Sequence, residues 1–357
     1  MAKTAKHIII GSTEAYSGKS ATIIGLAAQA QAAGLSIAYG KPIGLKAGDA
    51  ADTDVTFIQE TLELPPERVH PTLVSLTPET IQQRIIGQDT QDYQAALDQY
   101  QRCQSDLVLI EGPATLREGT LFDLSVANIA QVLEAQVLLV FRYKPDTLID
   151  DILAAQEQLG DRLCGVVINN LPIDQTGHVN EVVRPFLESK DIPLYGVLPY
   201  NELLLSVSVK ELVHQLKAEV LCRADRLNLM VGTLKIGAMN VNSALKYFRK
   251  AHHMAVVTGG DRTDLQLAAL ETSTHCLILT GHIAPTPEVL QRADDLEVPI
   301  LAVDLDTLTT VEIIEQAFGQ VRLHEAIKVH CIKEMVAEGF DLPRLLEQLG
   351  ISAVAAA

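Results

Sequence analysis

The segment 7–20, HIIIGSTEAYSGKS, contains the residues with the clearest potential for chemistry. A short apolar run leads into a turn, and Gly18, Lys19 and Ser20 then open a helical pattern. Glycine lets the backbone N–H groups of such a turn curl around phosphate oxygens, and the helix that follows contributes the positive end of its dipole. A lysine in this position reaches the β- and γ-phosphates, and the serine hydroxyl ligates Mg²⁺. The segment therefore predicts a site for a nucleotide and its magnesium ion.

This segment departs from the GxxxxGK[ST] pattern at one position. Thr13 stands where the pattern has its first glycine, and Gly11 lies two residues earlier, so the loop must turn differently. We expect the loop residues Thr13 and Glu14 to contact the nucleotide beside the Gly-Lys-Ser triplet. The alternative is an ordinary strand–turn–helix connection with a surface lysine.

Two charged residues follow the next apolar runs. Lys41 precedes Pro42, which keeps Lys41 out of the helical region, so the chain leaves its strand extended. Glu111 ends the run 107–110. Because the carboxyl ends of parallel strands face the ligand crevice, Lys41 could supply a second positive charge to a γ-phosphate or an anionic substrate. Glu111 could hold Mg²⁺ or orient an attacking group, so we predict both residues as catalytic.

Three aspartates and one asparagine are weaker candidates. Asp49, Asp52 and Asp54 lie in the loop before a predicted helix, and helix capping and solubility explain two of the three. Asn169 ends a predicted strand, and an amide with one acceptor and two donors suits the edge of adenine. A turn before Pro172 explains the same asparagine about equally well.

The elements that must position these residues alternate between apolar runs and amphipathic stretches, which is typical of an α/β fold with a parallel sheet covered on both faces. The expected strands of the first domain are 7–10, 35–39, 106–110, 136–141, 165–169 and 194–198. The expected helices are 19–32, 147–159 and 178–189. A last helix is expected before residue 220, with Leu212, Leu216 and Val220 on its apolar face.

A second α/β series follows without a glycine- or serine-rich linker. Its expected strands are 227–231, 254–258, 275–280 and 299–303. Its expected helices are 242–250, 263–271, 287–295 and 309–318, and terminal helices are expected at 324–338 and 342–349. We therefore predict a nucleotide-binding domain over 1–220, a smaller α/β domain over 221–325, and C-terminal helices and a tail over 326–357.

Composition excludes several classes of function. The 357 residues carry a formal net charge of −17, which argues against broad binding to a phosphate backbone, and the absence of tryptophan argues against a single-strand stacking platform. The five cysteines form no CxxC pair and fit reduced thiols, and Cys276 falls inside a predicted strand as a core residue. No stretch approaches a membrane span. We expect a cytoplasmic protein that binds neither nucleic acid nor membrane.

Together, the residues of the first domain resemble the dethiobiotin synthetase branch of P-loop proteins. In that branch a P-loop, a Lys-Pro after strand two, an aspartate in the following loop and a Glu-Gly after strand three recur in this order, and here they fall within residues 5–220. The roles that this resemblance implies are phosphate binding by Lys19, Mg²⁺ binding by Ser20, Asp54 and Glu111, contact with the γ-phosphate or second substrate by Lys41, and base contact by Asn169.

The second domain carries the turn Gly259, Gly260, Asp261, Arg262 and Thr263 between a strand and a helix. Two glycines permit close backbone approach, the arginine can clamp an anion, and the aspartate or threonine can cap the helix; a plain turn explains them about equally well. With this turn, the second domain looks like a DRTGG-type regulatory domain. The pair of domains resembles the N-terminal half of long phosphotransacetylases, and because no acetyltransferase domain follows in this sequence, we expect no phosphotransacetylase activity.

Three hypotheses follow. The first is an ATP- and Mg²⁺-binding regulatory or sensor protein, coupled to a small-molecule effector or a protein partner at the 259–263 turn. The second is an ATP-dependent ligase or slow ATPase that activates a small carboxylate, suggested by Lys41 and Glu111. The third is a degenerate P-loop scaffold that has lost binding through the change at Thr13. A homo-oligomer is also expected, formed through apolar strands of the second domain.

Overall fold

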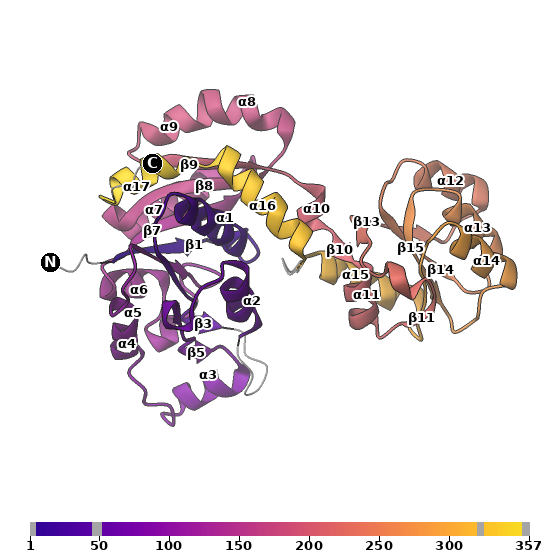
Figure 1. Ribbon diagram of the computed structural model, residues 1–357, viewed down its shortest axis with the longest axis horizontal. Coiled ribbons are helices and arrows are strands. Elements are labelled where there is room, and N and C mark those ends of the chain that lie inside the picture. Colours follow the sequence, from indigo (N-terminus) through magenta and orange to yellow (C-terminus); the bar gives the residue numbers. More distant parts are fainter. Residues whose placement is uncertain (1–4, 45–51, 320–324, 352–357) are drawn as a thin grey trace. The chain divides into compact units, whose positions relative to one another are not determined.

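The computed structural model describes residues 5–44, 52–319 and 325–351 (Figure 1). Asp49 lies outside these described residues. The chain divides into two compact units, one made of residues 1–200 together with 323–357 and the other of residues 201–322. We expected a boundary near residue 220 and separate C-terminal helices. The compact units divide earlier, and the C-terminal helices belong to the first unit because they pack on its helix α1.

The first unit is built on a seven-stranded sheet in the order β4-β2-β6-β1-β7-β8-β9, with every neighbouring pair parallel. This arrangement confirms the α/β class with a parallel sheet. The sequence missed β4 because it is only two residues long. In chain order the strands are β1 Lys6–Gly11, β2 Ile37–Gly40, β4 Val69–His70, β6 Leu107–Glu111, β7 Gln136–Arg142, β8 Leu163–Leu171 and β9 Leu194–Pro199.

Helices cover both faces of this sheet (Figure 1). A short two-stranded pair, β3 Ile43–Gly44 with β5 Val74–Ser75, lies beside it. The helices before α7 are α1 Lys19–Ala32, α2 Thr53–Thr61, α3 Pro78–Ile85, α4 Tyr93–Ala96, α5 Asp98–Gln101 and α6 Val126–Val132. The later ones are α7 Leu148–Leu159, α8 Thr176–His178, a π-helical segment Val179–Val183, α9 Arg184–Glu188, α16 Ala326–Gly339 and α17 Leu342–Gln348.

Helix α16 lies directly against α1, although more than 280 residues separate their sequences (Figure 1). Gly25 makes this approach possible, because a Cβ atom at that position would lie 2.3 Å from Cβ of Val336. The side-chain amide of Gln29 donates a 2.7 Å hydrogen bond to the carbonyl oxygen of Val336. The C-terminal helices therefore cover the helix that opens with Lys19 and Ser20.

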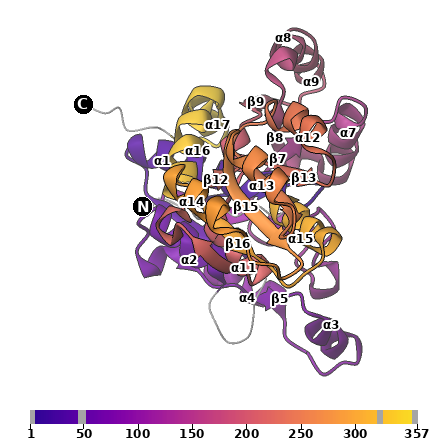
Figure 2. The same cartoon turned by 90° about the vertical axis from the view of Figure 1, so that its right-hand side faces the viewer.

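The second unit has a five-stranded sheet in the order β11-β16-β15-β14-β13, in which only β11 runs antiparallel. Buried residues alternate between its two faces: Met254 and Val256 lie in one core, Ala255 and Val257 in the other. Helices α12, α13 and α14 cover the first face, and α11 and α15 the second (Figure 2). The strands are β11 Glu219–Cys222, β13 Thr233–Gly237, β14 Met254–Gly259, β15 Thr274–Thr280 and β16 Ile300–Ala302.

The remaining elements of this unit correct two expectations. The helices are α10 Glu202–Leu205, α11 Val209–Leu216, α12 Val241–Phe248, α13 Thr263–Leu270, α14 Pro287–Asp295 and α15 Thr307–Gly319. Helix α11 ends at Leu216, because the next residue, Lys217, is left-handed at φ 49°. Val220 therefore lies on β11 and not on the helix as expected. Of the strand expected at 227–231, only Met230–Val231 (β12) forms one, and it pairs antiparallel with Val207–Ser208 (β10) in a separate two-stranded sheet.

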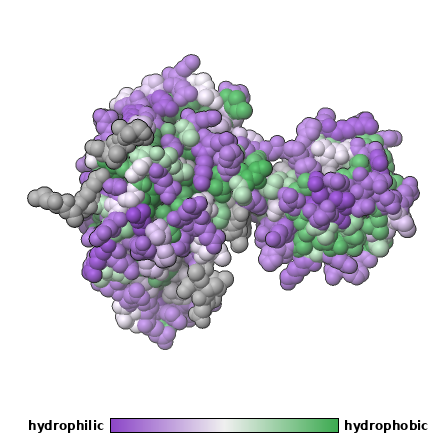
Figure 3. All heavy atoms as spheres, in the orientation of Figure 1, coloured by the Kyte–Doolittle hydropathy of each residue, from purple (hydrophilic) through white to green (hydrophobic). Residues whose placement is uncertain are grey.

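The burial of Cys276 and the polarity of the surface agree with what the sequence predicts. Cys276 is fully buried in β15, as expected of a core residue, and burial raises the pKa of its thiol. Hydrophilic residues dominate the face shown in Figure 3, with hydrophobic ones scattered among them. None of the helices in the described residues is long and apolar enough to cross a membrane.

Candidate nucleotide-binding site

The loop that joins β1 to α1 has the conformation expected of a phosphate-binding turn. Gly18 immediately precedes α1 and adopts a left-handed conformation with φ 105°, which disfavours any side chain. A Cβ atom at Gly18 would lie 2.2 Å from Nδ2 of Asn169. The hydroxyl of Ser12 accepts a 3.2 Å hydrogen bond from the backbone N–H of Glu14 and tightens the start of the loop. Only glycine fits the position before Lys19.

Asn169 braces this loop from the far side. Its Nδ2 donates a 2.8 Å hydrogen bond to the carbonyl oxygen of Ser17, and the Ser17 hydroxyl is buried with no hydrogen-bond partner among the described residues. Arg142, at the end of β7, donates a 2.8 Å bond to the carbonyl of Tyr16. Asn169 thus already has a role in positioning the loop, and its contact with a base stays a prediction.

Glu14 and Lys144 form an ion pair at this side of the loop. The sequence singled out Glu14 as a nucleotide contact, but it missed Lys144 and Arg142, both of which follow the apolar part of β7. Two cationic residues at the carboxyl end of an apolar strand could have indicated that they lie beside the loop. The pair holds the Glu14 carboxylate toward β7 in the structure.

Lys19 is the first residue of α1 and is only 8% exposed. Burial lowers the pKa of its ammonium group, and the nearby carboxylates of Glu111 and Glu118 offset part of that effect. Lys41 also lowers it, so the two lysines are close enough to repel. The structure therefore brings Lys19, Lys41 and Glu111 together, as the sequence predicted.

Ser20, Tyr39 and Glu111 form a hydrogen-bonded cluster next to Lys19. The Ser20 hydroxyl donates to Oε1 of Glu111 at 2.9 Å, and the Tyr39 hydroxyl donates to Oε2 at 2.8 Å. Tyr39 is fully buried, and its pKa lies well above the ordinary value because of burial and the adjacent Glu111. The sequence predicted Ser20 and Glu111 but missed Tyr39.

Lys41 is held by two carboxylates. Its Nζ lies 2.6 Å from Asp54 and 3.5 Å from Asp52. Burial lowers the pKa of Lys41, but Glu111, Asp54 and Asp52 outweigh this and raise it overall. Asp52 also caps α2 by accepting the N–H of Asp54, so its expected capping role is confirmed and the ion pair is an additional one. In the structure, Asp54 neutralises Lys41.

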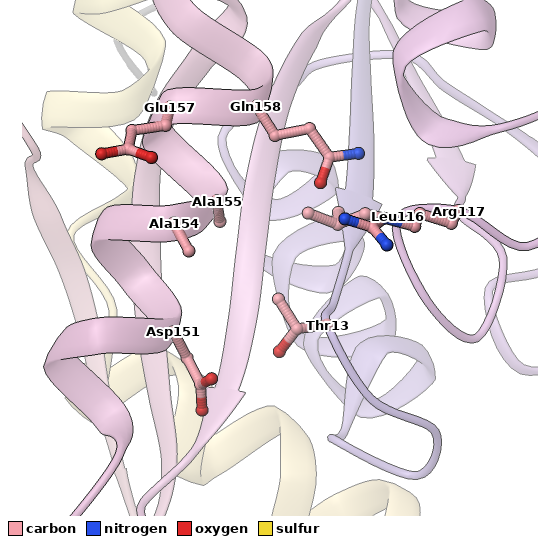
Figure 4. Close-up of a pocket in the computed structure, with 8 residues that line it drawn as sticks. All are labelled: Thr13, Leu116, Arg117, Asp151, Ala154, Ala155, Glu157 and Gln158. Atoms are coloured by element: carbon pink, nitrogen blue, oxygen red, sulfur yellow. The ribbon is translucent and has the colours of Figure 1, made fainter.

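An open cleft of about 610 Å³ begins beside Thr13 (Figure 4). Thr13 faces α7 across it, with Arg117 on the loop after β6 and Asp151 on α7 (Figure 4). The complete lining is Thr13, Leu116, Arg117, Asp151, Ala154, Ala155, Glu157 and Gln158. Hydroxyl, guanidinium and carboxylate groups therefore line an open space next to the β1–α1 loop.

In the 259–263 turn of the second unit, the arginine that was expected to clamp an anion already has partners within the protein. Arg262 pairs with Asp264, in the first turn of the following helix α13, at 3.1 Å and donates to the carbonyl of Met239 at 3.1 Å. Arg262 itself precedes α13 and no side chain caps that helix, so capping by Asp261 or Thr263 was wrong. A Cβ at Gly260 would lie 2.2 Å from the carbonyl oxygen of Ile283, so this glycine serves chain packing.

Gln266 on α13 contacts this turn, and the sequence analysis missed it. It is fully buried on α13, and its Nε2 donates 3.0 Å hydrogen bonds to the carbonyls of both Gly259 and Gly260. Its Oε1 is buried without a partner among the described residues. A polar residue one turn into an apolar helix was the available signal.

The donor set around Ser20 fits a magnesium ion. A hydroxyl and a carboxylate oxygen lie 2.9 Å apart, and hard oxygen ligands of this kind suit Mg²⁺, which usually completes its shell with phosphates and water. Within the described ranges, no group of three His, Cys, Asp or Glu side chains could hold a metal by itself.

Comparison with known proteins defines the class. Residues 6–208 match the AAA domain family and residues 211–317 match the DRTGG domain. The first match covers more than half of the 357 residues, so the chain belongs to the AAA domain family. The expected order of a P-loop domain and a DRTGG domain is confirmed, and this combination fits a nucleotide-binding regulatory protein.

Two curated relatives match nearly the whole length of this chain. The phosphate acetyltransferase of Synechocystis sp. is 23% identical over 365 residues, which cover 96% of this chain and 51% of that protein. The phosphate acetyltransferase of Nitratidesulfovibrio vulgaris is 24% identical over 370 residues, again 96% and 51%. The chain spans about half the length of these relatives.

Among solved structures, the CBS and DRTGG domains of the regulatory region of Clostridium perfringens pyrophosphatase, complexed with its activator diadenosine tetraphosphate, cover 43% of this chain. That match involves 72% of the other chain at 17% identity, with a TM-score of 0.29.

Proposed function

We propose that this chain is a regulatory or sensor protein that binds ATP with Mg²⁺ in its first unit. The observation that carries this proposal is the Ser20–Glu111 hydrogen bond of 2.9 Å, which joins the start of α1 to the end of β6 beside the buried Lys19. In this arrangement Lys19 would neutralise the β- and γ-phosphates, and Ser20 and Glu111 would hold the metal ion.

The loop geometry supports the same proposal. The left-handed Gly18 and the buried hydroxyl of Ser17, which has no partner within the described part of the chain, leave hydrogen-bonding capacity at the start of α1, where the helix dipole favours an anion. Lys41 is a further cation whose charge acts on Lys19, and it would be shared between Asp54 and a γ-phosphate. Thr13 and Glu14 would contact the nucleotide from the start of the loop.

The regulatory part of the proposal rests on the second unit. A DRTGG domain follows the P-loop domain, and its Gly259–Thr263 turn lies at the carboxyl end of β14, where parallel sheets bind ligands. Because Arg262 is paired with Asp264, an anionic effector would have to compete with that aspartate.

A second candidate function is an ATP-dependent ligase or slow ATPase acting on a small carboxylate. The cleft beside Thr13 favours it, because a second ligand there would lie next to the phosphate loop and could reach Arg117. Turnover separates the two candidates: tight ATP binding with negligible hydrolysis in the presence of metabolite mixtures would exclude the ligase.

Calorimetric titration of the full chain with ATP and Mg²⁺ tests the proposal. Lys19→Ala should weaken ATP binding at least about tenfold, because it removes the charge that faces the phosphates. Lys190→Ala, at an exposed position of the same unit, is the matched control and should bind as the wild type does. Equal ATP affinity in Lys19→Ala and wild type would exclude both candidate functions.

A further inference from the structure

We propose that Tyr39 is a positioning residue whose hydroxyl fixes the carboxylate of Glu111 for a divalent cation. The inference rests on the proposed nucleotide site, and it adds a residue to that site which acts through Glu111 and touches neither phosphate nor metal.

The strand register explains why this tyrosine can reach this carboxylate. Tyr39 of β2 is paired with Leu109 of β6, and Glu111 lies two residues further along β6. Residues two apart on a strand share a face, so Tyr39 and Glu111 point to the same side of the sheet. Two residues span about 6.6 Å along a strand, which is close to the length of a tyrosine side chain. The hydroxyl therefore arrives at the end of β6.

The two hydrogen bonds to Glu111 come from separate elements. Ser20 on α1 donates to Oε1 at 2.9 Å and Tyr39 on β2 donates to Oε2 at 2.8 Å. With one donor on each oxygen, rotation of the carboxylate would break at least one bond. Glu111 is thus fixed in orientation as well as in position.

This arrangement has a consequence for Ser20. Its single proton is directed at Glu111, so the remaining lone pairs of its oxygen point elsewhere and can ligate a cation. If Tyr39 did not hold Oε2, the carboxylate could rotate. The Ser20 hydroxyl, which donates to that carboxylate, would then reorient with it. Tyr39 would therefore affect both protein ligands of the metal.

Tyr39 is itself closely packed. It is fully buried in a strand that has neighbours on both sides, β4 and β6. The next residue, Gly40, faces the opposite side of the sheet, where the ring of Tyr100 fills the space that a Cβ would need. A buried hydroxyl costs free energy unless it is hydrogen-bonded, and the partner of this one is Glu111.

Tyr39→Phe keeps the ring and removes only the hydroxyl. We expect nucleotide affinity without Mg²⁺ to stay within twofold of the wild type, and the apparent Mg²⁺ affinity of the ATP-bound protein to fall about tenfold, as for loss of a hydrogen bond to a charged group. The first is measured by titrating the full chain with ATP in EDTA, and the second by titrating the ATP-bound protein with MgCl₂ in a buffer without EDTA.

Tyr100→Phe is the matched control. Tyr100 is equally buried in the same unit, but its hydroxyl donates to the carbonyl of Pro71 at 2.8 Å, on the other side of β2. Its loss should leave the Mg²⁺ affinity unchanged. In a Glu111→Gln background, Tyr39→Phe should have no further effect on the Mg²⁺ affinity, because the residue acts through the carboxylate.

The outcomes separate the two proposals. If wild-type protein shows no Mg²⁺-dependent ATP binding, the proposed function fails and the role of Tyr39 fails with it. If wild-type protein shows such binding and Tyr39→Phe has the same Mg²⁺ affinity, only the positioning role is overturned. Should Tyr39→Phe not fold, incorporation of 3-fluorotyrosine, a stronger hydrogen-bond donor, decides: the Mg²⁺ affinity must change in wild type and not in Glu111→Gln, and equal responses overturn the inference.

Discussion

The side-chain amide of Asn169 donates a 2.8 Å hydrogen bond to the carbonyl oxygen of Ser17, 152 residues earlier in the chain. The same nitrogen lies 2.2 Å from the point where a Cβ atom of Gly18 would be, which is too close for any side chain there. The end of β8 thereby presses on the last turn of the phosphate-binding loop and fixes the direction in which its N–H groups point.

Gly18→Ala should weaken ATP binding while leaving the protein folded. The added methyl group meets the Asn169 amide and also requires a left-handed φ of 105°, which costs about 1 kcal/mol or more in strain alone. We expect at least a tenfold loss of ATP affinity in calorimetry, with the circular dichroism spectrum unchanged.

Gly177→Ala is the control for this substitution. Gly177 lies in α8, and nothing comes within 4 Å of the place that a Cβ atom would take, so alanine there should leave both ATP affinity and stability intact. ATP binding by Gly18→Ala at wild-type strength would show that the loop conformation is not the one used for phosphate.

Much of this site was predictable because it depends on local signals. The Gly-Lys-Ser triplet defined the start of α1 at Lys19, and the apolar run of β6 placed Glu111 at a strand end. Parallel strands then had to bring Ser20 and Glu111 to one edge. In each case a short segment and the rule for parallel sheets were sufficient.

Contacts that depend on register or on distant packing were not predictable. Tyr39 reaches Glu111 only because β2 pairs with β6 in one particular register. The residue types in the two strands do not predict that register. Likewise, nothing in the sequence of α16 indicates that it returns to α1, because an apolar helix face does not specify its partner. Gly25 was the one hint, since a glycine inside a helix often marks a close approach.

His70 should make the protein less stable in mild acid. It is buried on β4 and stacks on Tyr100 with 4.5 Å between ring centroids, and burial, with a contribution from His7, lowers its pKa from 6.5 to about 4. Between these values the unfolded chain binds a proton that the folded chain does not, so stability is present above pH 6.5 and declines as the pH falls toward 4.

We expect His70→Phe to reduce this acid-dependent loss by about 1–2 kcal/mol, after allowance for partial solvent screening. Phenylalanine keeps the stacking and removes Nε2, which is buried without a partner among the described residues. Urea unfolding at pH 7 and pH 4.5 measures the difference, with the exposed His178→Gln as control. A loss as large in His70→Phe as in wild type would assign the acid sensitivity to other groups.

The contact between Gly25 and Val336 makes α1 and α16 depend on each other. Alanine at Gly25 would gain about 1 kcal/mol in helix propensity, but its Cβ would lie 2.3 Å from Cβ of Val336, and overpacking of this kind costs about 1–3 kcal/mol. We therefore expect Gly25→Ala to lower the free energy of unfolding by about 1 kcal/mol, whereas Gly177→Ala, in open space, should not.

A double-mutant cycle identifies the cause. Val336→Gly removes Cβ and both methyl groups that an alanine at Gly25 would meet, so the double variant Gly25→Ala/Val336→Gly should be more stable than the sum of the single effects predicts, by about 1 kcal/mol or more. Urea denaturation of the four proteins measures this coupling. Strict additivity would mean that the cost of alanine at Gly25 does not come from its contact with Val336.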